Sequence, residues 1–201
     1  MKFHPDSPFF KFMDSLAAFI GLNVIFLITC LPVVTIGPAL IALYTVTMKE
    51  ARGEGGYIFS TYLKVFKDNL RRGTAAWCLL LALGLIFFYN AYFWGELNTV
   101  PGNICMFLMT ALFVIWGLIL LYTFPLMARF ENSLRQTLKN ALRIALTNVK
   151  ATLGILGILA ACILLCLGVP QYAKVFMILV GFSFFAYCNS MIFVRVFRNY
   201  E

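Results

Sequence analysis

The chain has 201 residues, of which 62% are hydrophobic and only 12% are charged, and its formal net charge is +8. Soluble domains usually carry about 25% charged residues, so this composition excludes an ordinary soluble globular fold. The positive charge does not indicate nucleic-acid binding, because no basic stretch alternates with base-stacking aromatic residues. We therefore expect a single integral membrane domain over residues 1–201, with the lipid bilayer as a partner and no nucleic-acid partner.

The stretch between the first two apolar segments is itself apolar, although it carries the marks of a turn. Pro32 and Pro38 each remove a backbone donor, and Gly37 permits conformations that other residues resist. We predict that residues 1–50 form a helical hairpin whose turn lies in or at the edge of the bilayer. Because lipid cannot satisfy free backbone groups, we expect the turn to be packed within protein and not exposed to lipid.

The rest of the chain alternates amphipathic and apolar stretches. The apolar segment at 38–48 is short for a full crossing, because a spanning helix needs roughly 20 residues. Five spans with a re-entrant second segment are therefore an alternative to six. The predicted elements are an amphipathic helix over 57–72, a second hairpin over 74–126, an amphipathic helix over 130–149 and a third hairpin over 151–196.

An internal repeat favours six spans. Residues 43–45 (Leu-Tyr-Thr) recur at 121–123, and Asn69-Leu70-Arg71 is echoed by Asn148-Val149-Lys150. These matches predict a repeated unit of a hairpin followed by an amphipathic helix. All but one of the 16 Lys and Arg residues then lie on the same side, which the positive-inside rule makes cytoplasmic. We predict an all-α membrane helix bundle, six transmembrane helices as three hairpins joined by two cytoplasmic amphipathic helices, in the cell membrane with both termini cytoplasmic.

The apolar segments contain polar side chains but no clearly embedded charge, and this disfavours a proton-coupled transporter. The usual role of such polar groups is hydrogen bonding between helices, worth about 0.6–2 kcal/mol each, and the alternative is a path for a substrate. Asn23 and Asn189 are the first to test, because an amide in lipid must find partners. The candidate intramembrane polar or turn positions are Asn23, Pro32, Thr35, Gly37, Pro38, Tyr44 and Asn189.

Catalytic motifs are missing from the sequence. We find no nucleophile paired with a base, no phosphate-binding glycine loop and no metal-ligand spacing. The six cysteines lie inside apolar runs, and we interpret them as packing residues. We therefore expect neither an enzyme nor a cofactor or metal. Small residues four apart, such as Gly157 and Ala161, predict close helix packing within one chain or between copies. The sequence is therefore compatible with a homo-oligomer.

Three blocks carry a family resemblance: residues 31–39 (Leu-Pro-Val-Val-Thr-Ile-Gly-Pro-Ala), residues 42–44 (Ala-Leu-Tyr) and residues 66–69 (Phe-Lys-Asp-Asn). The chain resembles the YesL-like family, known as domain of unknown function 624. The resemblance implies a small integral membrane protein of Gram-positive bacteria, often encoded beside carbohydrate-uptake ABC transporters. It supplies no catalytic or binding residues.

Two functions follow as expectations. The first is an accessory membrane protein associated with carbohydrate uptake, acting with the subunits of a sugar ABC importer or with its regulators. The alternative is a stand-alone channel or facilitator for a small solute, in which Asn23, Thr35 and Tyr44 line a half-way site. The sequence gives neither the ligand nor the partner.

Overall fold

A computed structural model describes residues 8–97 and 99–200, and it describes side chains from Leu16 onward. None of these residues forms a strand, so the predicted all-α class is confirmed. The helices are α1 (Pro8–Cys30), α2 (Ile36–Ala51), α3 (Ile58–Asp68), α4 (Leu70–Glu96), α5 (Val100–Arg129), α6 (Leu134–Thr147), α7 (Val149–Gly168), α8 (Pro170–Phe176) and α9 (Phe182–Phe197), with a short 3₁₀ turn η1 (Val33–Thr35) and a π-helical turn η2 (Met177–Gly181).

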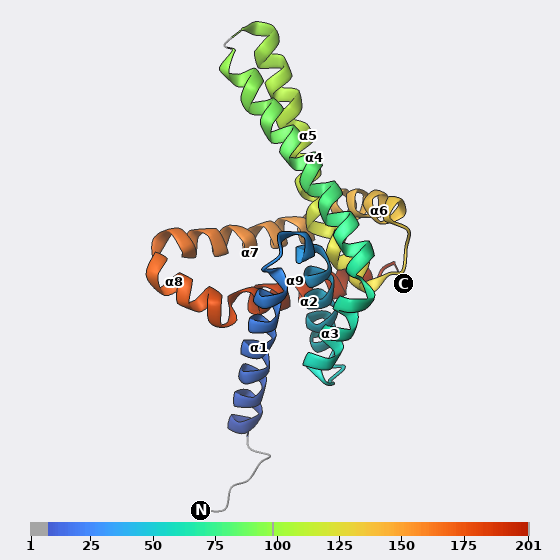
Figure 1. The fold of residues 1–201 in the computed structure, drawn as a ribbon, viewed down its shortest axis with the longest axis vertical. Helices are drawn as coiled ribbons and strands as arrows, with labels where there is room; N and C mark the ends of the chain where they lie inside the picture. The colour runs from blue at the N-terminus through green and yellow to red at the C-terminus, as the bar shows by residue number, and fades with distance from the viewer. Residues whose placement is uncertain (1–7, 98, 201) are drawn as a thin grey trace, which may run out of the picture.

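Helix α2 lies at the centre of the molecule (Figure 1). It contacts α1, α3, α4, α5 and α9. Ala39, Ile41 and Ala42 have no exposed surface, and two of these three are small enough to let neighbouring helices approach closely. The segment that looked too short to cross a membrane is therefore the element around which the other helices pack.

Within residues 8–97 and 99–200, five helices are long and apolar enough to cross a membrane, and they indicate a multi-pass membrane protein. The apolar part of α1 whose side chains are described, Leu16–Cys30, is shorter and is not among the five, so six spans are not confirmed. The second segment, which the alternative treated as re-entrant, is one of the five. The five are Val33–Ala51, Leu70–Glu96, Val100–Arg129, Val149–Gly168 and Pro170–Phe197.

The long helices diverge from the centre, and the predicted layout of three hairpins is not confirmed. Figure 1 shows α4 and α5 running together to the top of the view, α7 running across it, and α1 pointing toward the bottom. None of the most apolar part of α5 is buried by other parts of the chain.

The amphipathic helices are shorter than predicted. The first was expected over 57–72, but α3 ends at Asp68, and Arg71 and Arg72 belong to the first turn of α4. The reason is Asn69, whose Nδ2 donates to the carbonyl of Val65 at 3.0 Å and so competes with the backbone pattern of a continuous helix.

The second amphipathic helix shows the same junction. It was expected over 130–149, and α6 begins after Ser133, whose hydroxyl accepts from the Gln136 N–H at 3.4 Å. It ends before Asn148, whose Nδ2 donates to the carbonyl of Ile144 at 3.1 Å. The two asparagines of the predicted repeat, Asn69 and Asn148, thus occupy equivalent positions between an amphipathic helix and a long apolar one.

The two tyrosines of the repeat contact the same phenylalanine. Tyr44 of α2 and Tyr122 of α5 each place their ring edge-on to Phe193 of α9, with ring centroids 5.7 Å and 5.3 Å from it. Thr45 and Thr123 both donate to the carbonyl four residues earlier in their helices. Helix α9 therefore packs against both copies of the repeated Leu-Tyr-Thr sequence.

Gly37 and Gly73 let α2 and α4 touch. A Cβ at Gly37 would collide with the backbone carbonyl of Gly73, and a Cβ at Gly73 would come within 2.7 Å of the Pro38 nitrogen. The obstacle is backbone on both sides, which cannot move aside as a flexible side chain can. The two helices can approach this closely only because neither position has a side chain.

Replacing Gly37 with alanine should therefore destabilise the fold by about 1–3 kcal/mol, because the added methyl forces α2 away from α4. Thermal unfolding followed by circular dichroism in detergent measures the effect. The matched control is Gly117→Ala in α5, where no atom lies within 4 Å of the added Cβ. Gly117→Ala should be neutral or stabilising by up to about 1 kcal/mol, because alanine favours helix. Equal effects of the two substitutions would contradict the close approach.

Candidate functional site

Asn23 is fully buried and connects α1 to the irregular part of the last hairpin. Its Nδ2 donates to the carbonyls of Met177 at 2.9 Å and Ile178 at 2.7 Å. Its Oδ1 accepts from the backbone N–H of Ser183 at 3.0 Å. The amide therefore finds partners for both ends, as an amide in apolar surroundings must.

The position of these partners explains the irregular turn. In η2 the helix widens to a π-helical turn, and such a turn disturbs the regular pairing of carbonyls with N–H groups. Asn23 bridges this disturbance, because it accepts from one side of the turn and donates to the other. The Ser183 hydroxyl adds a bond to the Phe19 carbonyl at 3.0 Å. Asn23 is thus a helix-joining residue and not part of an open path.

Thr35 satisfies the turn between α1 and α2. Its Oγ1 lies 2.6 Å from the Thr29 carbonyl and 2.7 Å from the Pro32 carbonyl. Its backbone N–H also donates to Pro32 at 3.0 Å. An apolar turn can exist here because one threonine pairs with the carbonyls that the broken helix leaves free.

The expectation that the whole turn is packed within protein is wrong for its first half. Leu31 is 79% exposed and Val33 is 59% exposed, whereas Gly37 and Pro38 are buried. The exposed half consists of apolar side chains, whose contact with lipid costs little once the backbone groups are paired. Gly37 also differs from expectation, since it is helical and its role is the close approach to Gly73. Pro38 fits the first turn of α2, where backbone N–H groups have no partner within the helix.

Tyr44 and Asn189 meet beside a cavity of about 200 Å³ between α1, α2, α7 and α9. Both side chains belong to the lining of this cavity. The Asn189 Oδ1 is buried and has no hydrogen-bond partner. The rest of the lining is almost entirely apolar, including Phe26, Leu43 and Phe185. Neither Asn23 nor Thr35 lines this cavity, so the structure does not bring those two together with Tyr44.

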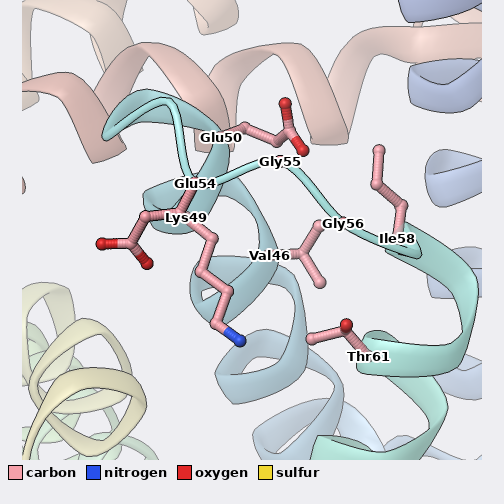
Figure 2. Close-up of a pocket in the computed structure, with 8 residues that line it drawn as sticks. All are labelled: Val46, Lys49, Glu50, Glu54, Gly55, Gly56, Ile58 and Thr61. Carbon is pink, nitrogen blue, oxygen red and sulfur yellow. The ribbon is translucent and has the colours of Figure 1, made fainter.

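A second pocket, of about 120 Å³, lies between the end of α2 and the start of α3. Figure 2 shows that the side chains of Lys49, Glu50 and Glu54 point in different directions around it. Glu54 is held by Arg52, with Nε–Oε1 and Nη2–Oε2 distances of 2.5 Å and 2.8 Å, and this hydrogen bond lowers the pKa of the Glu54 carboxyl. Charged groups that diverge in this way do not form a catalytic pair.

The third cavity is the largest of these, at about 610 Å³, and lies between α2, α3, α4 and the end of α5. None of its lining residues is among the candidate positions predicted from the sequence. Its charged lining residues Asp68, Arg72, Arg129 and Glu131 come from both halves of the repeat. These four residues lie on amphipathic or interfacial stretches, where a charged side chain is normally interpreted as exposed to solvent. Only the folding of α5 against α2 and α4 brings them together.

The described residues hold no cluster of three or more His, Cys, Asp or Glu side chains that would bind a metal ion. The six cysteines are all free. Gly157, predicted as a close packing position, has no atom within 4 Å of an added Cβ, so it makes no close helix contact within this chain.

The chain was compared with known protein families. Residues 19–91 match the family model described as Protein of unknown function, DUF624. The predicted resemblance to the DUF624, or YesL-like, family is therefore confirmed over this stretch. The match includes Asn23, the turn, α2 and α3, which is the part of the chain that surrounds the first asparagine junction. In the comparisons with curated proteins and with solved structures, nothing matches.

Asn23→Ala should lower the free energy of unfolding by about 1–3 kcal/mol, because it leaves the carbonyls of η2 and the Ser183 N–H without their bridge. Unfolding in mixed detergent micelles measures this change. The control is Asn90→Ala, since the Asn90 Nδ2 donates only to Ile86 in its own helix, at 2.8 Å. We expect the control to change stability by less than about 0.5 kcal/mol. An effect of Asn23→Ala no larger than the control would contradict the joining role.

Proposed function

We propose that this chain is an accessory membrane protein that acts with a carbohydrate ABC importer. The family resemblance implies the association with carbohydrate uptake. The observation that supports an accessory role is the hairpin of α4 and α5, which extends beyond the rest of the molecule (Figure 1) and has little of its most apolar surface buried within the chain.

The side chains of this hairpin suit contact with another membrane protein. Its outer half carries exposed aromatic residues, and aromatic side chains are enriched at protein interfaces and at the membrane surface. Helix α7 is also exposed, but its exposed large hydrophobic residues are all aliphatic, as a surface in contact with acyl chains requires. The exposed aromatic residues of the hairpin are Phe88, Tyr89, Tyr92, Phe93 and Phe107.

Site-specific photocrosslinking tests this proposal. A photoreactive residue replaces Phe107, which is 72% exposed, or Leu164 of α7, which is 68% exposed and serves as the matched control. In native membranes we expect the Phe107 variant to crosslink to a permease subunit of the importer and the Leu164 variant to give only lipid adducts. Lipid adducts alone at both positions would overturn the proposal.

A facilitator for a small solute has less support. The cavity beside Tyr44 and Asn189, at about 200 Å³, falls below the 300–1,000 Å³ typical of small-molecule sites, and its walls are apolar. Asn23 and Thr35, the other residues expected to line a half-way site, have their hydrogen bonds with backbone groups of the chain itself.

The orientation is also part of the proposal. We place the chain in the cell membrane with both termini cytoplasmic, supported by the one-sided distribution of Lys and Arg. A fluorescent protein fused after residue 201 should fluoresce, and alkaline phosphatase fused within residues 98–103 should be active. The reverse pair of results would show an inverted chain.

A further inference from the structure

The cavity of about 610 Å³ is lined by Arg72, one of whose side-chain donors makes no hydrogen bond. The Nη2 of Arg72 is buried and has no hydrogen-bond partner, while the rest of the side chain is partly exposed. An unpaired N–H of a guanidinium is costly, because its charge must be stabilised without water. This nitrogen is not itself accessible, but Arg72 lines the cavity, where an anionic oxygen paired with the guanidinium would stabilise its charge.

The charged residues of the lining indicate which chemical group of a ligand supplies this oxygen. Arg129 also lines the cavity, so a second guanidinium adds positive charge to that of Arg72. The planar guanidinium fits the oxygens of phosphate or carboxylate in a forked arrangement. Asp68 and Glu131 lie on the same walls and would repel a bare anion, but they accept hydrogen bonds from hydroxyl or ammonium groups of a larger ligand.

The remaining walls are mostly apolar, with Thr45 and Asn69 as further polar residues. The side chains of Ile41, Val65, Met127 and Phe130 suit the carbon skeleton of an ester. The volume lies within the range of sites for small molecules. The cavity sits where the apolar helices α4 and α5 meet the amphipathic helix α3, which is the depth of lipid headgroups if α4 and α5 cross the membrane.

We propose that this cavity binds a phosphate ester, with the Arg72 guanidinium as the group that holds the phosphate. The ester carries hydroxyl or ammonium donors that face Asp68 and Glu131. Both a phospholipid headgroup and a small soluble phosphate ester have this chemistry. This proposal does not depend on an ABC importer, so its test is independent of the test of the proposed function.

Two binding measurements on the full chain separate the two sources. In the first, glycerol 3-phosphate is titrated into delipidated protein in detergent and followed by calorimetry. In the second, the protein is placed in phosphatidylcholine nanodiscs containing phosphatidylglycerol, and native mass spectrometry counts the phosphatidylglycerol that stays bound. We expect one molecule per chain in at least one of the two measurements. Binding in the first identifies a soluble ester, and binding in the second alone identifies a headgroup.

The variants use a neighbouring arginine as control. Arg71 is exposed and does not line the cavity, so Arg71→Gln changes the net charge equally without touching the site. Arg72→Gln should weaken binding about tenfold or more, and Arg71→Gln less than about twofold. Arg72→Lys keeps the charge, and since lysine cannot form the fork it should also weaken binding several-fold.

Four results would overturn the proposal: no binding of either probe to the wild-type chain, binding that does not saturate at one site, equal weakening by Arg71→Gln and Arg72→Gln, or wild-type affinity of Arg72→Lys. Size-exclusion profiles and unfolding temperatures are compared for all variants. If Arg72→Gln does not fold, the wild-type and Arg72→Lys measurements decide the question.

Discussion

The contact between Gly37 and Gly73 brings α2 against α4 with backbone touching backbone, and the central place of α2 depends on it. Once α2 is there, its other faces must be filled. Thr47 pairs with Ser190 of α9 at 2.7 Å, and both side chains are fully buried. Tyr44 packs on Phe193 from the same face. Helices far apart in the sequence are therefore held by small residues and short polar contacts, because apolar surface alone does not distinguish protein from lipid.

The same requirement governs the irregular segments. At four of the breaks between helices, a nearby side chain pairs with backbone groups: Thr35 at the first turn, Asn23 at the π-helical turn, and Asn69 and Asn148 at the two junctions. Three buried side-chain atoms of the described residues have no hydrogen-bond partner, namely Arg72 Nη2, Trp77 Nε1 and Asn189 Oδ1. Of these residues only Arg72 is charged, and it lines the largest of the three cavities, so it is the most informative of the three for an anionic ligand.

The two halves of the repeat use these rules in parallel. Each has a helix with Leu-Tyr-Thr, an amphipathic helix that ends at asparagine, and a long apolar helix that follows. The parallel breaks down outside the centre, where the hairpin of α4 and α5 extends from the molecule and α7 runs across it (Figure 1). This asymmetry gives the protein one exposed arm rich in aromatic residues, on which the proposed contact with an importer rests.

Composition and periodicity by themselves determined the helical class, the membrane character and the order of apolar and amphipathic segments, because these follow from local hydrophobicity and spacing. The breaks at Asn69 and Asn148 were not predicted, because hydrophobic periodicity continues across both asparagines. The need of Asn23 for partners was also predictable, since a buried amide must be paired. The identity of those partners was not, because residues 23 and 177 meet only in the folded chain. The tertiary structure alone decided that Gly37 serves close packing, that Leu31 and Val33 stay exposed, and that Arg72 faces a cavity. Each of these depends on which helix lies next to which, and hydrophobic patterns carry no information about neighbours distant in sequence.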